Sequence, residues 1–181
     1  MTHEAQPVVV FITLGSNIEP ETNLRRAVRM ITQNRHLTLH AISRVYESPA
    51  IDAAGQIAPD QDHFLNAAVM VESDGHFPPM ALKYNMLRFI ELCLGRTRGP
   101  DKYAPRTIDL DIALYGDQVI DTPHIAIPDP DILTRVHIAL PLADLAPNLP
   151  HPVTGRSLAA IAAPLAANTP ITVRADLDLT S

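Results

Sequence analysis

The sequence contains no tryptophan and a single cysteine among its 181 residues. One cysteine cannot form an internal disulfide, and the apolar, helical surroundings of Cys93 predict a thiol buried in the core. The sequence has no apolar run long enough to cross a membrane. Met1–Pro7 also lacks the basic and apolar pattern of a secretory signal. We therefore expect a cytoplasmic protein that has no membrane partner.

Basic residues are fewer than acidic ones: the sequence has 14 Lys and Arg and 20 Asp and Glu, which gives a net charge of −6. A nucleic-acid partner is not expected at this charge. His124, His137 and His151 do not have the spacing of metal ligands, so no zinc site is predicted. The length and the 46% hydrophobic content are those of an ordinary globular protein with one sizeable core.

The most informative stretch that is present is an expected strand over residues 107–115. Ile108, Leu110, Ile112 and Leu114 alternate onto one face, and Thr107, Asp109, Asp111 and Tyr115 onto the other. Two carboxylates one strand period apart repel each other when bare and favour a cation between them. Mg²⁺ is the natural candidate, and Arg106, just ahead, suits bidentate binding of a phosphate.

The same tripeptide occurs a second time, at Asp176-Leu177-Asp178 near the end of the sequence. Exposed strand faces often carry acids, so Asp-Leu-Asp alone does not distinguish a metal–phosphate site from a solvated surface. The first copy differs because it follows a basic loop containing Gly and Pro. Both interpretations remain open on the residues alone.

The remaining pattern predicts an α+β fold. Strands are expected at residues 8–14, 37–47 and 64–72, with helices after Pro20 and from Pro79. The second helix should bury Met86, Phe89, Ile90, Cys93 and Leu94. Loops are expected at residues 50–63 and 96–106, a short strand at 118–120, and helices at 131–140 and 157–163.

The order strand, helix, strand, strand, helix, strand is that of a ferredoxin-like split βαβ sandwich. We expect an antiparallel sheet with helices on one face, an open face for ligands, and an appended C-terminal region of hairpin and helices. Residues 1–168 should form a single domain, and residues 169–181 a tail or an edge strand.

Several short stretches occur together in a characteristic order. They are Leu14–Asn17, Ser48–Pro49, Phe64–Val69, Ile90–Leu92 with Gly95–Arg96, Lys102–Ile112, Ile127–Pro128 and Pro141–Pro147. Between about Val8 and Ala163 this joint pattern resembles the 6-hydroxymethyl-7,8-dihydropterin pyrophosphokinase family of folate biosynthesis.

The resemblance implies an enzyme that transfers pyrophosphate from ATP to the hydroxymethyl group of the dihydropterin and releases AMP. It implies two Mg²⁺ ions held by Asp109 and Asp111, ATP and the dihydropterin as partners, and a monomer. The implied catalytic residues are Arg96, Arg106, Asp109 and Asp111. The implied ATP-binding residues are Glu91, Arg96, Arg98, Tyr103, Arg106, Ile112 and Arg135. The implied pterin-binding residues are Ser48, Pro49, Ile51, Phe64, Asn66 and His137.

The sequence departs from the family pattern at Ala113, which is smaller than the usual aliphatic residue, in a longer loop before Phe64, and at two further positions. Asp129 stands where members usually have His, and His137 stands where they commonly have Phe. Two alternatives also remain, namely a Mg²⁺-dependent nucleotidyltransferase and a non-catalytic ligand-binding domain on the same scaffold. A nucleotidyltransferase would have its Gly-Ser turn close in sequence to the acidic strand, whereas Gly15 lies far from Asp109 here.

Overall fold

A single large sheet organises the computed structural model, which describes residues 6–52, 54–101 and 103–180. Within these residues the sheet has six strands in the order β5-β1-β4-β3-β8, and β2 also pairs with β4. Every pairing is antiparallel. This order, with β1 and β4 in the centre, is that of the predicted split βαβ sheet.

The elements follow one another along the chain with few long connections. They are β1 (Val8–Ser16), α1 (Pro20–Thr32), β2 (Leu37–Ile42), β3 (Tyr46–Ser48), β4 (Phe64–Ser73), α2 (Pro79–Ala81), the π-helical η1 (Leu82–Leu87), α3 (Arg88–Cys93), β5 (Asp109–Tyr115), β6 (Ile120–Asp121), β7 (Ala126–Ile127), the 3₁₀-helical η2 (Pro130–Leu133), α4 (Val136–Leu145), α5 (Leu158–Asn168) and β8 (Thr172–Val173).

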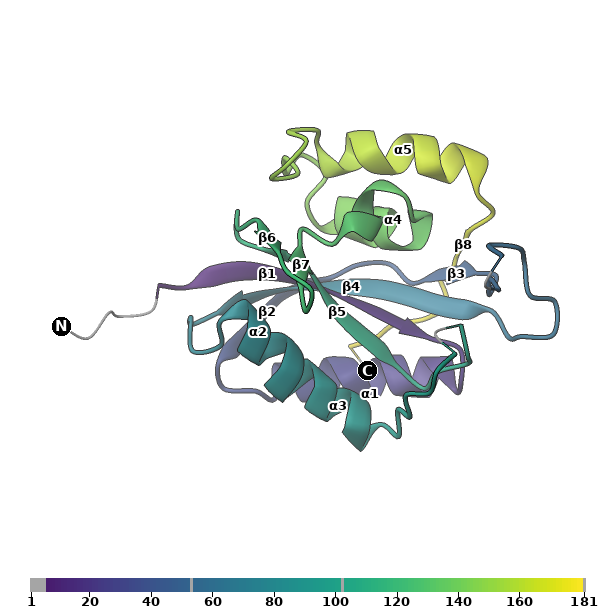
Figure 1. Ribbon diagram of the computed structural model, residues 1–181, viewed down its shortest axis with the longest axis horizontal. Helices are drawn as coiled ribbons and strands as arrows, with labels where there is room; N and C mark the ends of the chain where they lie inside the picture. Colours follow the sequence, from purple (N-terminus) through teal and green to yellow (C-terminus); the bar gives the residue numbers. More distant parts are fainter. Residues whose placement is uncertain (1–5, 53, 102, 181) are drawn as a thin grey trace.

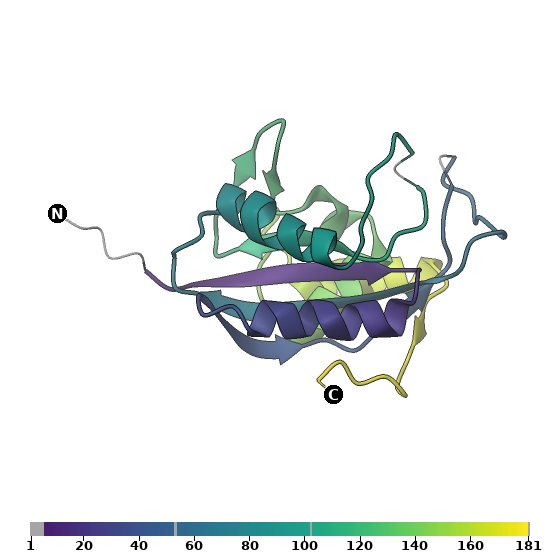
Figure 2. The same cartoon turned by 90° about the horizontal axis from the view of Figure 1, so that it is seen from below.

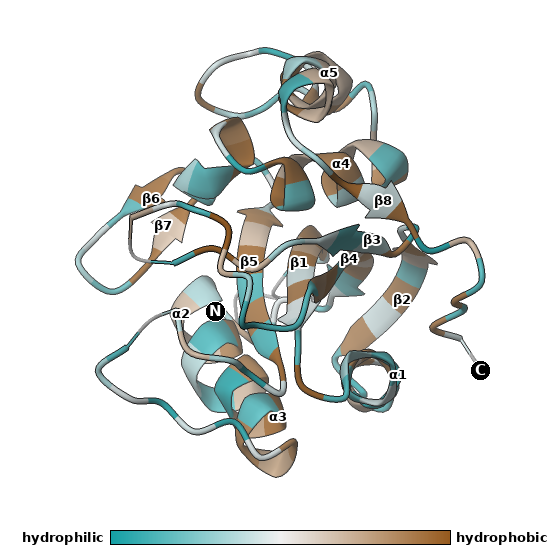
Figure 3. Cartoon of the chain, turned by 90° about the vertical axis from the view of Figure 1, so that its right-hand side faces the viewer, coloured by the Kyte–Doolittle hydropathy of each residue, from teal (hydrophilic) through white to brown (hydrophobic). Residues whose placement is uncertain are grey.

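The sheet lies between two helical layers (Figures 1 and 3). On one side, α1 and the α2–η1–α3 segment cover the residues of β1 that include Val10, Ile12 and Leu14, which belong to the larger core cluster. On the other side, α4 and α5 pack around Phe11 and Ala68 in a second cluster. The predicted open face therefore exists only over the part of the sheet that α4 leaves uncovered.

The period-two pattern of the central strand breaks at a bulge. Phe11 pairs with Leu114 and Ile12 pairs with Ile112, so Ala113 has no partner in β1. Because β5 contains one extra residue at this point, the side chains after Ala113 point to the opposite sheet faces from those that the alternation predicts. Leu114 consequently packs in the α4–α5 cluster and Tyr115 in the larger one. The prediction that Leu114 shares a face with Ile108 was wrong for this reason.

Two other local predictions were also wrong. The expected strand 37–47 is interrupted between β2 and β3, where the Ser43 hydroxyl accepts a 2.8 Å hydrogen bond from the Ala68 N–H. In the second helix Cys93 is exposed, as is Phe89, at 58%. The buried stripe of that helix instead runs through Met86 and Ile90 with Glu91 beside them, so Glu91 takes the place expected for an apolar residue.

The end of the chain returns to the sheet. β8 pairs with β3 and forms that edge of the sheet, and Arg174 forms ion pairs with Glu21, Glu47 and Asp176. Leu179 is 4% exposed and belongs to the larger core cluster. In Figure 2 this segment passes beneath α1. None of the described helices is long and apolar enough to cross a membrane.

Candidate active site

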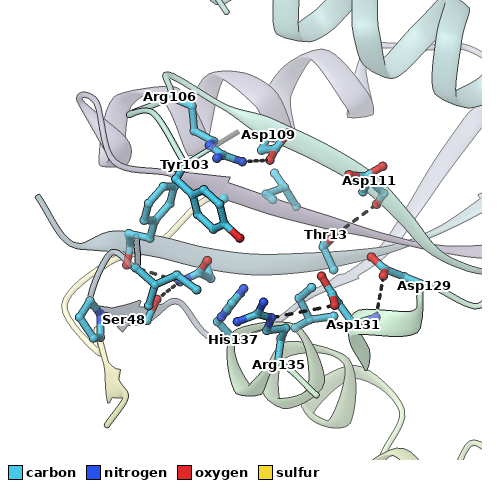
Figure 4. A pocket seen from close by; sticks show the side chains of 17 residues that line it. Thr13, Ser48, Tyr103, Arg106, Asp109, Asp111, Asp129, Asp131, Arg135 and His137 are labelled. Atoms are coloured by element: carbon cyan, nitrogen blue, oxygen red, sulfur yellow. Dashed lines mark hydrogen bonds and ion pairs between the residues drawn. The ribbon is translucent and has the colours of Figure 1, made fainter. Parts of the chain in front are cut away.

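A cavity of about 300 Å³ occupies the uncovered part of the sheet, beside α4 (Figure 4). Its floor comes from β1, β4 and β5, and one wall comes from η2 and the start of α4. Among the predicted site residues, the lining includes Ser48, Pro49, Ile51, Phe64, Asn66, Tyr103, Arg106, Asp109, Asp111, Arg135 and His137. Segments far apart in the sequence thus meet around one space.

Asp109 and Asp111 lie on the cavity face of β5, as the alternation predicted. Neither carboxylate is bare. Asp109 accepts from the Arg106 guanidinium, and Arg96 Nη2 lies 3.5 Å from its other oxygen. Lys83 Nζ lies 2.8 Å from Asp111 Oδ1. Cations of the protein therefore balance the charge repulsion that the sequence led us to expect.

The two carboxylates suit a metal that arrives with phosphate. Their side chains are 27% and 43% exposed towards the cavity. Within the described part of the chain, no group of three or more His, Cys, Asp or Glu side chains is arranged to hold a metal. Mg²⁺ needs only one or two carboxylates when substrate phosphates and water complete its oxygen ligands, so Asp109 and Asp111 fit that ion.

The other end of the cavity combines an aromatic ring with a fixed amide. Asn66 is buried in β4, and its Nδ2 donates to Ser48 Oγ at 3.0 Å and to the Tyr46 carbonyl at 3.2 Å. These bonds set the orientation of the amide. The Phe64 ring lies 5.6 Å from the Arg106 guanidinium carbon, which connects this end of the cavity to the carboxylates.

The wall formed by η2 and α4 contains two groups whose pKa values move in opposite directions. Burial lowers the pKa of His137 to about 4, with a smaller contribution from Arg135, so the imidazole is neutral at pH 7. Burial raises the pKa of Asp129 to about 6, and the charge of Asp111 adds to the shift. The Asp129 carboxylate accepts a 2.9 Å hydrogen bond from the Asp131 N–H.

Four predicted residues lie outside the cavity lining. Glu91 is buried, accepting from the Leu110 N–H at 2.9 Å and from Arg98. Burial raises the pKa of the Glu91 carboxyl, although both donors oppose that shift. Arg96 donates to the Ile108 carbonyl at 3.1 Å. Glu91 and Arg96 thus contact the backbone on either side of Asp109, at the start of β5.

The fourth of these residues, Ile112, lies in the larger core cluster on the opposite side of the sheet. Its assignment to the nucleotide site stays a prediction. Lys102, one of the cations expected in the loop before β5, lies outside the described residues.

Some lining residues were missed by the sequence argument. Thr13 and Gly15 face the cavity because β1 pairs with β5, with Thr13 opposite Asp111 and Gly15 opposite Asp109. The alternation of β1 combined with this pairing would have predicted both. Lys83 does not line the cavity but contacts Asp111. No sequence pattern could have predicted this contact, because it depends on how η1 packs beside β5.

Comparison with known proteins agrees with this geometry. A profile of the family described as 7,8-dihydro-6-hydroxymethylpterin-pyrophosphokinase (HPPK) matches residues 11–147. The 2-amino-4-hydroxy-6-hydroxymethyldihydropteridine pyrophosphokinase of Pseudomonas aeruginosa is 36% identical over 150 residues, covering 82% of this chain and 86% of that protein. The Bacillus subtilis protein of the same name is 37% identical over 138 residues, covering 76% of this chain and 77% of the relative.

Solved structures show the same fold. The crystal structure of Plasmodium falciparum HPPK-DHPS wild type with pteroate has a TM-score of 0.69 and 13% identity, and the match covers 92% of this chain. It covers 46% of that longer chain, so this chain spans less than half of it. Because the profile match and the relatives extend over most of the sequence, the chain belongs to the 7,8-dihydro-6-hydroxymethylpterin-pyrophosphokinase family and is an ATP-dependent pyrophosphokinase of folate biosynthesis.

Proposed function

We propose that the cavity holds ATP and 6-hydroxymethyl-7,8-dihydropterin side by side, with Mg²⁺ bound between the triphosphate and the carboxylates of Asp109 and Asp111. One observation carries this proposal. The acidic pair and Arg106 line the same cavity as Phe64 and Asn66. A flat heterocycle and a polyphosphate need different surroundings, and this cavity offers both within reach of each other.

In this proposal the pterin lies at the end of the cavity formed by β3 and β4. Phe64 stacks on the flat ring, and the fixed amide of Asn66 forms hydrogen bonds with the polar edge of the ring. Ser48, Pro49 and Ile51 complete this end. His137 faces the same space, and its lowered pKa keeps the imidazole neutral, so it adds an uncharged flat surface to the pterin site.

The triphosphate lies against the cations around Asp109. Arg106 and Arg96 both have guanidinium groups within reach of this carboxylate, and a guanidinium can bind a phosphate bidentately. Arg98 contributes a third guanidinium beside Glu91. Tyr103, Arg135 and Ile112 complete the proposed nucleotide site.

In the transfer, the hydroxymethyl oxygen of the pterin bonds to the β-phosphorus of ATP. The bond from that phosphorus to the oxygen shared with the α-phosphate breaks, the hydroxyl proton passes to water, and AMP leaves. When bound, Mg²⁺ neutralises charge on the triphosphate and on the leaving oxygen. The chain itself contributes position and charge: it holds the two substrates in line and lines the phosphates with cations.

Product analysis of four variants tests this proposal. Asp109→Asn and Asp111→Asn should each lower dihydropterin-dependent AMP formation by about 10²–10³-fold, a loss comparable to removing one charge-stabilising group. Asp176→Asn and Asp178→Asn alter the second Asp-Leu-Asp and should leave the rate unchanged. Full activity in either β5 variant, or turnover without a divalent cation, would contradict the metal assignment. Release of pyrophosphate in place of AMP would indicate nucleotidyl transfer.

Three further expectations belong to this proposal, namely a monomer, a cytoplasmic location and a single domain over residues 1–168. Sedimentation equilibrium measures the first directly. Cell fractionation measures the second. Limited proteolysis followed by mass measurement tests the third: a boundary at residue 168 predicts cleavage close to it, whereas the pairing of β8 with β3 and the burial of Leu179 favour a product that keeps the C-terminal segment.

A further inference from the structure

Lys83 has no part in the site proposed above, yet its ammonium group contacts one carboxylate of the acidic pair, that of Asp111. The residue belongs to η1, on the far side of β5 from α4. Its Nζ lies 2.8 Å from Asp111 Oδ1, and its side chain is only 22% exposed. A lysine on a freely solvated surface would not be held in this way, so the contact depends on how η1 packs beside β5.

The backbone of η1 explains how Lys83 comes to be there. The Arg88 N–H donates to the Lys83 carbonyl, a bond between residues five apart that defines a π-helical turn. Such turns inside longer helices occur frequently at functional sites. The change in helical phase places Lys83 near the strand, while Tyr84 and Asn85 remain exposed.

An ammonium group and a divalent cation would compete for the carboxylate of Asp111. The ammonium group already contacts Asp111 Oδ1 at 2.8 Å, and a divalent cation bound to the same carboxylate would repel it. Asp109 differs, because its partners are guanidinium groups that a triphosphate can share with the carboxylate. Metal binding at Asp111 would therefore weaken the contact with Lys83.

We propose that Lys83 is the counter-ion of Asp111 in the metal-free protein and competes with the nucleotide-bound metal for this carboxylate. Lys83 would then be a positioning residue that sets the Mg²⁺ concentration at which the site fills. This inference rests on the proposed function, since it assumes that Asp111 binds the metal that accompanies ATP.

Binding of α,β-methylene-ATP, measured by calorimetry over a series of Mg²⁺ concentrations, tests the competition. Lys83→Met should lower the Mg²⁺ concentration for half-maximal binding by about two- to fivefold, the size expected for a partly exposed ion pair. Lys83→Arg should restore a value close to that of the wild type. Arg29→Met makes the same charge change on the exposed side of α1 and should have no effect.

Unfolding by urea in EDTA provides a measurement that needs no nucleotide. Lys83→Met should lower stability when Asp111 is present, and the loss should vanish in the Asp111→Asn background. If stability shows no such coupling, or the Mg²⁺ midpoint in Lys83→Met is unchanged or raised, the inference is overturned. If the wild type binds no analogue at any Mg²⁺ concentration, the proposed function fails first and this inference fails with it.

Discussion

Phe64 is the side chain that most clearly marks the pterin end of the cavity. Its ring is partly exposed to the cavity and lies near Arg106, so its surface is available to a ligand. Phe64→Ala should weaken dihydropterin binding by about 1–3 kcal/mol, from lost ring burial and stacking, and should leave nucleotide binding largely intact. Calorimetry with each ligand measures both.

Phe89→Ala is the matched control for that change. This ring is 58% exposed on α3 and lies outside the cavity lining, so its loss should leave pterin affinity unchanged. Intact pterin affinity in Phe64→Ala would show that the ring belongs to the core and not to the binding site.

Asp129 gives the site a predictable pH dependence. Its folded-state pKa of about 6 exceeds its ordinary value, so between about pH 4 and pH 6 the folded protein binds more protons than the unfolded chain. This residue therefore makes stability fall as pH rises through that window. Asp129→Asn should stabilise the protein by about 2 kcal/mol at pH 7, and the gain should disappear near pH 4.

Urea unfolding of the wild type and Asp129→Asn at both pH values checks this prediction. Comparing the two proteins at the same pH cancels the opposite contribution of His137, whose lowered pKa makes stability rise with pH. A stability difference that is the same at pH 4 and pH 7 would mean that Asp129 does not titrate in the fold as described.

Single residues were predictable from sequence where a motif or an alternation identified them. Strand periodicity identified Asp109 and Asp111, and the family motif identified Asn66; all three line the cavity. Glu91 shows the limit of this approach. Physical pattern alone favours the surface for a helical glutamate, but this one is 2% exposed and bonds to the Leu110 N–H across the packing interface. A long-range bond of this kind leaves no trace in local sequence.

The positions of the strands and helices were easier to predict than which side of each element is buried. A helix was expected at residues 157–163, and Ser157 caps the observed α5, its hydroxyl accepting a 3.2 Å hydrogen bond from the Ala160 N–H. The bulge at Ala113 could not be predicted, because it arises from the pairing of β5 with β1. The bulge allows Leu114 to pack under α4 and α5 while Asp111 still faces the cavity.

The C-terminal segment after α5 supports a prediction about stability. Leu179 is 4% exposed within the larger core cluster, close to the docked strand β8. Leu179→Ala should lower the free energy of unfolding by about 2–4 kcal/mol, from the lost apolar contacts and the cavity left behind. Activity under stable conditions should not change, because this residue lies on the α1 side of the sheet.

Leu92→Ala provides the comparison for this segment, because Leu92 is 68% exposed on α3 and its truncation should change stability by less than about 0.5 kcal/mol. Urea unfolding of both variants decides the matter. Equal effects in the two would mean that the C-terminal segment does not pack against the core in solution.

The two faces of the sheet have different roles in the whole molecule. One face is covered by α1 and α3 and forms the larger core, while the other is shared between α4, α5 and the cavity (Figure 1). The order of elements was sufficient to predict the first face. The extent of the second was not predictable, because the helices after residue 130 have no fixed place in the split βαβ pattern.

Paramagnetic broadening by Mn²⁺ tests the central claim most directly, namely that nucleotide and metal bind on the cavity side of β5. Amide signals of the protein would be recorded with α,β-methylene-ATP, before and after replacing Mg²⁺ by trace Mn²⁺. We predict the strongest broadening at residues 109–111 and 13–15, and the weakest at residues 176–178 and in α5. Broadening centred on residues 176–178, or none that depends on the nucleotide, would contradict the account.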